Sequence, residues 1–255
     1  MKYKISLLVF FTLLQFSCEQ LSGPDSSGSS YLPLPALTIQ WNEQNSIVCF
    51  GTSLTYGYGA GEKQRDEPVW TGGHPDTNNT GDSSYPRFLQ ERLKIKVYNK
   101  GFVGARTNYA LSILTDSVIS KKPALILLEF GANDFLWNIP SRTTDSLLNL
   151  LVARIKQTGT QIVMLSFIHP DMVQYRHTGN WSSEDSALAL EYSSMINQVA
   201  VRNSVLLVDF PLKGVFGNVL LMSDALHPNG EGYKTMATNV YSALIRTFEQ
   251  NGMVK

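Results

Sequence analysis

From residue 45 onward, short apolar runs alternate with longer stretches of mixed polarity. The runs are rich in β-branched and other apolar residues, and the last three are almost continuously apolar, which is typical of strands buried on both faces. They lie at 46–50, 95–98, 124–130, 161–167 and 204–210. We therefore expect each of these runs to form a β-strand.

Between the runs, apolar residues recur every three or four positions, which is the spacing of an amphipathic helix. These stretches lie at 84–94, 107–120, 143–157, 185–201 and 230–248. Strand and helix in alternation predict an α/β fold in which a parallel sheet carries helices on both faces. In such sheets ligands bind beyond the carboxyl ends of the strands, so the residues that follow each strand are the candidates for a site.

The first 40 residues lack this alternation. Lys2 and Lys4 precede an apolar run at 5–14, which is too short to span a bilayer comfortably and has the length of a signal-peptide core. A small residue then directly precedes Cys18, as in the bacterial lipobox, where the cysteine is lipidated. We predict a signal peptide at 1–17 and lipidation of Cys18; the alternative is an ordinary signal peptide with a coincidental cysteine.

The segment 18–40 is rich in Ser, Gly and Pro at its start, which predicts a flexible tether between the lipid anchor and one domain at 41–255. The expected location is therefore the bacterial envelope, with the exported protein held on the periplasmic or the surface side of a membrane. The second cysteine, Cys49, falls in an apolar run and is expected to be a small buried hydrophobe. The two cysteines thus predict no disulfide framework.

Composition narrows the function. The hydrophobic fraction is 43%, the charged fraction is 16% and the formal net charge is zero. Such a chain can bury a substantial core, and it lacks the basic patch of a nucleic-acid-binding protein. His74, His169 and His177 show no metal-ligand spacing, and there is no phosphate-binding or dinucleotide-binding glycine motif. We therefore expect no metal, no cofactor and no nucleic-acid partner.

Three residues suggest nucleophilic catalysis. Ser53 directly follows the first predicted strand, and Asp224 and His227 lie three residues apart near the last helix. A spacing of three would place the aspartate and the histidine on one side of a helical turn, so that the aspartate orients the imidazole and the imidazole activates the serine. Taken singly, Ser53 could equally be a helix N-cap, and His227 an ordinary surface histidine.

Two further residues could supply hydrogen-bond donors to an oxyanion. Gly104 follows the second predicted strand and has no side chain to obstruct a ligand, and Asn133 follows the third with a side-chain amide. Together with the backbone N–H of Ser53, they would form an oxyanion hole. Each also has an ordinary structural interpretation, as a turn glycine and an Asx-turn asparagine.

The four segments that contain these residues resemble, in order, the four sequence blocks of the SGNH hydrolases, the GDSL-type esterases and lipases. The resemblance covers about 46–248 and implies a three-layer α/β/α fold with a five-stranded parallel sheet. It also implies that Ser53, Asp224 and His227 form a catalytic triad and that Ser53, Gly104 and Asn133 form the oxyanion hole. One departure is Thr52, which stands where the family usually has an aspartate.

The family resemblance implies a serine ester hydrolase that acts on acyl esters, such as lysophospholipids, aryl esters or thioesters, through an acyl-enzyme intermediate. Two alternatives remain open: a carbohydrate O-acetyl esterase or acyltransferase, and a non-catalytic surface lipoprotein with the same fold. The expected partners are a lipid or carbohydrate ester and, through the anchor, a membrane.

Aromatic residues in the loops beyond the strands are candidates for substrate binding. Trp70 lies in the long polar loop after the first strand, Trp137 follows the third strand, and Trp181 follows the fourth. They could form a platform for a sugar ring, an aryl ester or an acyl chain, or they could simply pack long loops against the domain. Loops of this length are often functional.

Overall fold

The computed structural model describes residues 45–60, 83–168 and 183–250, with side chains to residue 246. The predicted signal peptide, the lipidation site at Cys18 and the tether therefore lie outside the described residues. So do Trp70 and Trp181. Among the described residues, no helix combines the length and the apolar character needed to cross a membrane.

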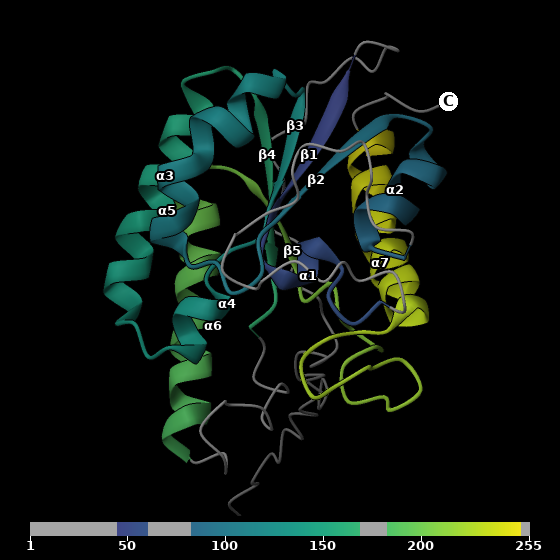
Figure 1. Ribbon diagram of the computed structural model, residues 1–255. Helices are drawn as coiled ribbons and strands as arrows, with labels where there is room; N and C mark the ends of the chain where they lie inside the picture. The colour runs from purple at the N-terminus through teal and green to yellow at the C-terminus, as the bar shows by residue number, and fades with distance from the viewer. Residues whose placement is uncertain (1–44, 61–82, 169–182, 251–255) are drawn as a thin grey trace, which may run out of the picture.

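A five-stranded parallel sheet forms the centre of the molecule (Figure 1). Its strand order is β2-β1-β3-β4-β5, and every neighbouring pair runs parallel. The strands are β1 (Ser46–Gly51), β2 (Lys96–Gly101), β3 (Leu125–Leu128), β4 (Gln161–Ser166) and β5 (Leu206–Asp209). This confirms the predicted fold class, and each strand overlaps its predicted run.

Helices cover both faces of the sheet, which gives three layers (Figure 1). Helices α3 (Thr107–Ser117), α5 (Ser141–Lys156) and α6 (Ser183–Arg202) lie on one face. Helices α2 (Tyr85–Leu93) and α7 (Gly230–Gln250) lie together on the other. All five correspond to helices that the apolar spacing predicts.

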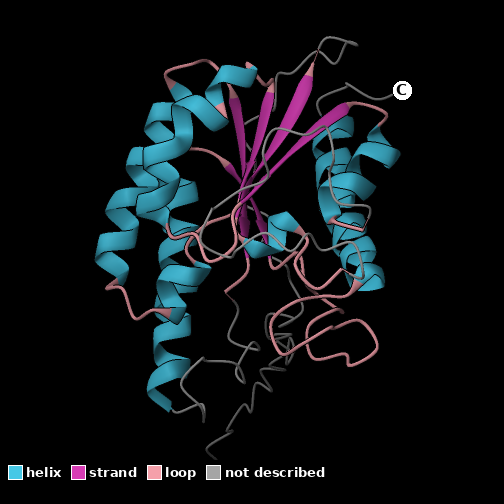
Figure 2. Ribbon diagram, viewed as in Figure 1, coloured by secondary structure: helices cyan, strands magenta, loops and turns pink. Residues whose placement is uncertain are grey.

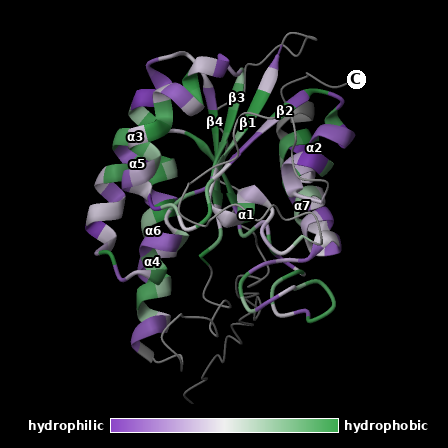
Figure 3. Cartoon of the chain, viewed as in Figure 1, coloured by the Kyte–Doolittle hydropathy of each residue, from purple (hydrophilic) through white to green (hydrophobic). Residues whose placement is uncertain are grey.

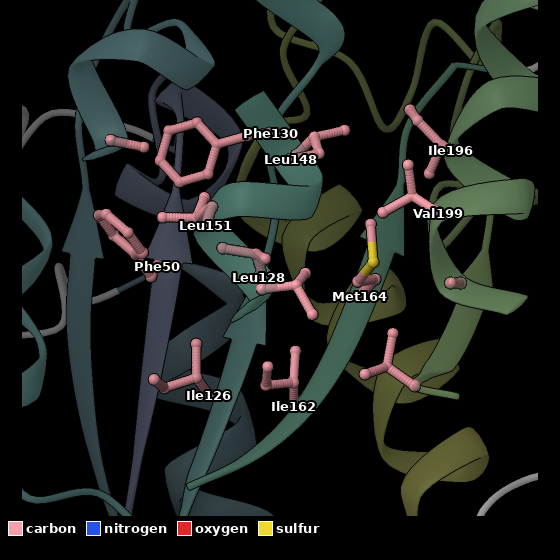
Figure 4. Close-up of a cluster of buried hydrophobic side chains, with 14 of the residues drawn as sticks. Phe50, Ile126, Leu128, Phe130, Leu148, Leu151, Ile162, Met164, Ile196 and Val199 are labelled. Atoms are coloured by element: carbon pink, nitrogen blue, oxygen red, sulfur yellow. The ribbon is translucent and has the colours of Figure 1, made fainter. Parts of the chain in front are cut away.

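The alternation of side chains along each strand divides the core into two clusters. Val48, Ile126 and Met164 pack towards α3, α5 and α6, in the cluster shown in Figure 4. Ile47 and Leu125 point to the opposite face and pack against α2 and α7. Because both faces are covered, β1, β3, β4 and β5 are mainly apolar, whereas the edge strand β2 is more polar and the helices are apolar on one side only (Figure 3).

Two short helices were not predicted from the sequence. Helix α1 (Ser53–Tyr56) begins two residues after β1, and helix α4 (Ala132–Leu136) begins four residues after β3. Both are too short to show a helical period, and both lie beyond the carboxyl ends of the strands (Figure 2). The predicted helix at 107–120 ends earlier than expected, at Ser117, and a 3₁₀ turn, η1 (Ile119–Lys121), follows it.

The strand order changes direction at β1, because the chain proceeds from β1 to β2 on one side and places β3 on the other. In open parallel sheets such a switch point opens a crevice at the carboxyl ends of the two strands. Ser53 follows β1 and Asn133 follows β3, so the fold brings both candidates to this switch point.

Candidate active site

Ser53 is the first residue of α1, on a tight turn from strand to helix. Thr52 is the N-cap residue, in an extended conformation, and Gly57 ends the helix in a left-handed conformation with φ 92°. The carbonyl of Ser53 accepts hydrogen bonds from the N–H groups of Gly57 and Tyr58, both at 3.0 Å. The cap is therefore Thr52 and not Ser53, which leaves the Ser53 hydroxyl available for another partner.

That partner is His227. Its Nε2 lies 3.1 Å from Ser53 Oγ, across 174 residues of sequence. Its Nδ1 lies 2.8 Å from Oδ2 and 3.0 Å from Oδ1 of Asp224. In the tautomer with the proton on Nδ1, the imidazole donates to the carboxylate and accepts from the serine hydroxyl, which is the arrangement of a nucleophile, a base and its orienting acid.

The segment that holds Asp224 and His227 is a bent loop, so the expectation of a helical turn is wrong. Asp224 Oδ1 accepts hydrogen bonds from the N–H groups of Leu226 and His227, both at 2.7 Å, and the chain folds back around this carboxylate. A short antiparallel bridge between Met222 and Pro228 closes the bend. A spacing of three thus brings the two side chains together through an Asx-type turn.

The same contacts determine the charge of Asp224. Partial burial raises the pKa of this carboxyl, but hydrogen bonds from the Leu226 N–H and from His227, together with the attraction of His227, outweigh burial and bring the pKa below its ordinary value. The carboxylate therefore stays ionised at neutral pH. An ionised group in this position favours an imidazolium at His227 when a proton moves to Nε2.

The two candidate oxyanion donors belong to neighbouring segments. Gly104 has φ 72° and is exposed, and a β-carbon there would meet no atom within 4 Å. Asn133 Nδ2 donates to the carbonyl of Ala105, next to Gly104, at 2.8 Å. An amide nitrogen has two hydrogens, so one remains after this bond. Gly101 has a different role, since a β-carbon there would lie 2.0 Å from the backbone nitrogen of Tyr56 in α1.

A buried carboxylate lies beneath the serine turn. Glu129 follows β3 and accepts hydrogen bonds from the Thr52 N–H at 2.7 Å, from the Thr52 hydroxyl at 2.9 Å and from the Thr55 hydroxyl at 3.0 Å. Sequence analysis did not single out Glu129. Its signal was present, because it is the one charged residue in the apolar run 124–130.

A second residue that the sequence did not single out is Tyr58. Its ring centroid lies 4.7 Å from that of His227, and its carbonyl accepts a hydrogen bond from the hydroxyl of Tyr233 at 2.7 Å. Gly59 permits this contact, since a β-carbon there would lie 3.1 Å from His227 Cβ and only 2.8 Å from the carbonyl oxygen of Pro228. The glycine-rich stretch therefore allows close packing against the histidine.

Asp134 links the two segments that contain the candidate oxyanion donors. Its Oδ2 accepts hydrogen bonds from the N–H and the hydroxyl of Thr107, both at 3.0 Å. This joins the start of α3, which follows the Gly104 segment, to α4, which contains Asn133. Burial raises the pKa of Asp134, and the hydrogen bonds from Thr107 oppose that rise.

Of the three tryptophans predicted to bind substrate, the structure describes Trp137. It follows α4 directly, and 63% of its surface is exposed. Trp70 and Trp181 lie outside the described residues, so their role stays a prediction. In the described ranges, no group of histidine, cysteine and acidic residues has the arrangement of a metal site.

Comparisons with known proteins identify the family of this chain. The model of the GDSL-like lipase/acylhydrolase family matches residues 49–235. An arylesterase from Vibrio mimicus is 26% identical over 201 residues, which is 78% of this chain and 88% of the relative. Esterase TesA from Pseudomonas aeruginosa is 23% identical over 159 residues, which is 62% of this chain and 74% of the relative.

Solved structures share the fold. The crystal structure of TesA superimposes with a TM-score of 0.63 at 20% identity and covers 80% of this chain and 99% of its own. A mutant of Axe2, an acetyl-xylooligosaccharide esterase from Geobacillus Stearmophilus, gives a TM-score of 0.59 at 18% identity, with 81% and 96% covered. With the family match over most of the domain, the chain belongs to the GDSL-like lipase/acylhydrolase family and is a carboxylic ester hydrolase.

Proposed function

We propose that Ser53, His227 and Asp224 catalyse ester hydrolysis through an acyl-enzyme intermediate. The observation that carries the proposal is the continuous chain of contacts from Ser53 Oγ through both nitrogens of His227 to the carboxylate of Asp224. A serine hydroxyl is a weak nucleophile until a base removes its proton, and this chain provides the base and the acid that orients it.

In the proposed mechanism, Ser53 Oγ attacks the ester carbonyl while its proton moves to His227 Nε2. The resulting oxyanion accepts hydrogen bonds from the N–H groups of Ser53 and Gly104 and from the second amide hydrogen of Asn133. His227 then gives its proton to the alkoxide, and the alcohol leaves. Water attacks the acyl-Ser53 ester with the same base, and this step releases the acid and restores the serine.

We further propose acyl esters with an apolar acyl or aryl group as substrates. Val219 and Leu220 support this, because 84% and 79% of their surfaces are exposed on the loop that leads to Asp224 and His227. Asn218 and Asn229 hold this loop through hydrogen bonds to its backbone, so the two apolar side chains stay in solvent. In Figure 3 the loop before α7 shows apolar stretches in green, separated by polar ones in purple and white.

The alternative substrate is an O-acetylated carbohydrate, and the exposed Trp137 favours it. An exposed indole next to α4, and thus close to Asn133, is a suitable surface for a sugar ring. Solved structures with this fold include an acetyl-xylooligosaccharide esterase and an acetyl xylan esterase. A transferase that hands the acyl group to a sugar would use the same intermediate.

We also propose that the protein is exported and anchored in a bacterial envelope by lipid on Cys18, on the strength of the lipobox-like segment at 1–18. Metabolic labelling with radioactive palmitate tests this proposal. Label that appears in the wild-type protein and is lost in Cys18→Ser supports the anchor. A wild-type protein without label contradicts it.

The experiment that tests the catalytic proposal compares three forms of the protein without residues 1–18: wild type, Ser53→Ala and the control Ser112→Ala. The control removes an exposed hydroxyl on α3, which donates to the carbonyl of Tyr109 and belongs to neither the triad nor the oxyanion hole. Each form is assayed on p-nitrophenyl acetate, butyrate, octanoate and palmitate. We expect Ser53→Ala to lower turnover by about a million-fold and Ser112→Ala to leave it unchanged.

A fluorophosphonate probe tests the intermediate directly. Mass spectrometry should find the probe on Ser53 and nowhere in Ser53→Ala. The chain-length profile distinguishes the two substrate classes, because preference for octanoate supports apolar acyl esters and restriction to acetate supports a carbohydrate esterase. Hydrolysis that survives Ser53→Ala would contradict the triad, while a folded protein inactive on all four esters would favour the non-catalytic alternative.

A further inference from the structure

We propose that Glu129 is a positioning residue for the nucleophile. Its ionised carboxylate accepts hydrogen bonds from Thr52 and Thr55, on both sides of Ser53, and so holds the serine in place. The inference rests on Ser53 being the nucleophile, as proposed above. It assigns a function to a residue that does not touch the substrate. Its effect on the reaction would pass entirely through the geometry of the turn.

The carboxylate is bound at three points of one short segment. Thr52 donates both its N–H and its hydroxyl, and Thr55 donates its hydroxyl, so the two residues that flank Ser53 at −1 and +2 have the same acceptor. The Thr52 hydroxyl also accepts from the Leu54 N–H at 3.4 Å. The backbone on both sides of Ser53 is therefore fixed relative to β3, 74 to 77 residues away.

Close packing fixes the position of the carboxylate. A β-carbon at Gly51 would lie 2.4 Å from Glu129 Oε2 and 2.2 Å from Thr55 Oγ1. Glu129 also donates its backbone N–H to the carbonyl of Phe50 at 2.8 Å, which continues the pairing between β1 and β3. Gly51 is thus the residue that allows the carboxylate to pass beneath the serine turn.

The groups that face Glu129 are neutral hydroxyls and a thiol. The hydroxyl of Tyr85, in α2, lies 3.4 Å from Thr55 Oγ1 and is hydrogen-bonded to Cys49 of β1. Tyr233, in α7, interacts electrostatically with Glu129. Within the described ranges, no ion pair includes Glu129. The ionised carboxylate is therefore held by hydrogen bonds from Thr52 and Thr55 and by no counter-charge.

Donor chemistry indicates that the ionised form fits this site. An ionised carboxylate only accepts hydrogen bonds, and Thr52 and Thr55 together offer it three donors. A protonated carboxyl would turn one of its oxygens into a donor, so at least one threonine contact would have to reverse or break. Thr52 suits an ionised partner better than the aspartate usual in the family, since an aspartate would place a second carboxylate against Glu129.

Glu129 should titrate within the pH range in which ester hydrolysis can be assayed. Complete burial raises the pKa of this carboxyl from 4.5 to about 7, and the hydrogen bonds from Thr52 and Thr55 limit that rise. A fall in pH through this region would protonate Glu129 and loosen the serine turn. Activity on the acid side should then require two deprotonations, one of the general base and one of Glu129.

The test measures kcat/KM against pH for wild type and Glu129→Gln, with the best p-nitrophenyl ester. For the wild type, we expect log(kcat/KM) to fall with a slope that approaches two over the pH range in which Glu129 becomes protonated, until the residual activity of the protonated form is reached. For Glu129→Gln we expect a slope of one, because the amide cannot titrate. At pH 8 we expect kcat to fall by about 10²-fold with KM unchanged, since a small misplacement of a reacting group has an effect of this size.

The matched control is Leu151→Ala, a buried substitution in α5 on the opposite face of the sheet. It should lower the melting temperature without changing the acid slope of two. If Glu129 only stabilised the fold, Glu129→Gln would also lower the melting temperature and leave the acid slope at two. A slope of two in Glu129→Gln, or a slope of one in the wild type, would overturn the proposal.

A gentler variant covers the case in which Glu129→Gln does not fold. Thr55→Val removes one donor and keeps the shape of the side chain, and we expect it to lower kcat, leave KM unchanged and move the acid limb to higher pH. An unchanged acid limb with wild-type kcat would count against the proposal. A wild type with no Ser53-dependent hydrolysis would instead contradict the proposed triad, so the two failures are distinguishable.

Discussion

The serine turn and the Asp224–His227 loop meet at one hydrogen bond, yet they are held in different ways. Ser53 is 8% exposed, and its neighbours are fixed by Glu129 across more than 70 residues of sequence. The side chain of Asp224 is 47% exposed, and its partners lie two and three residues away. The serine turn is therefore part of the core, whereas the hydrogen bonds of Asp224 all lie within its own loop.

This difference separates stability from activity. Substitutions in the loop should change the chemistry and leave the fold nearly intact, because exposed polar contacts contribute little to folding. Substitutions around the serine turn should change both, because close packing and buried hydrogen bonds are lost together. Substitutions of Asp224, Gly51 and Glu129 test this contrast.

Asp224→Asn should have the largest effect on activity. An amide oxygen can still accept from the Leu226 and His227 N–H groups, but the side chain no longer stabilises an imidazolium and can favour the wrong tautomer. We expect kcat to fall by about 10⁴-fold. The free energy of unfolding, measured by urea denaturation, should stay within about 0.5 kcal/mol of wild type.

A large loss of stability in Asp224→Asn would break the contrast, because it would show that the loop is also part of the folding core. Asn218→Ala is a useful control on the same loop. It removes the hydrogen bond that the Leu220 N–H donates to Asn218 Oδ1, outside the triad. Its kcat on p-nitrophenyl acetate should remain close to wild type.

Gly51→Ala should have the second largest effect, and it should act on stability first. The added β-carbon would lie within 2.8 Å of both Thr55 Oγ1 and Glu129, so the turn or the carboxylate must move. Overpacking of this kind costs about 1–3 kcal/mol. We expect a lower free energy of unfolding and, in the folded fraction, a reduced kcat.

Gly230→Ala provides the comparison for Gly51→Ala. The nearest atom to a β-carbon there lies 3.3 Å away, and the residue begins helix α7, where alanine is the better helix former. The free energy of unfolding of Gly230→Ala should therefore equal or slightly exceed that of the wild type. Equal stability of the two variants would show that the serine turn adapts more easily than the packing indicates.

Apart from its effect on kcat, Glu129→Gln should change the pH dependence of stability. The pKa of Glu129 rises from 4.5 in the unfolded chain to about 7 in the folded protein. Between these values the folded protein keeps a proton that the unfolded chain has lost, so the wild type loses stability as pH rises through this window. The loss should be on the order of 2 kcal/mol.

The variant has no carboxyl at this position, so it should lack that contribution. Urea denaturation at about pH 5 and about pH 8 gives the free energy of unfolding of both proteins. The effect is the amount by which the difference between the two proteins changes from one pH to the other. At the higher pH, the free energy of unfolding of Glu129→Gln should rise relative to that of the wild type. A difference that does not change with pH would show that Glu129 has an ordinary carboxyl pKa in the folded protein.

Much of the fold could be predicted from the sequence because its signals are local. The period of apolar residues located all five strands and the five long helices to within a few residues. Helices α1 and α4 could not be predicted, since four or five residues show no period and form only because β1 and β3 present them to the switch point. The bend at Asp224 was mistaken for a helical turn, because a spacing of three fits both.

Local patterns predict the order of strands and helices and a lipid anchor at Cys18, and they locate the serine, glycine, asparagine and Asp-x-x-His segments that indicate an ester hydrolase. The positions of Glu129 beneath Ser53 and of Tyr58 against His227 follow from the folded arrangement and from no local pattern. The physical reason is that periodicity and spacing act over a few residues. A buried carboxylate, in contrast, acquires its hydrogen bonds and its shifted pKa from groups that come together only when the sheet has formed.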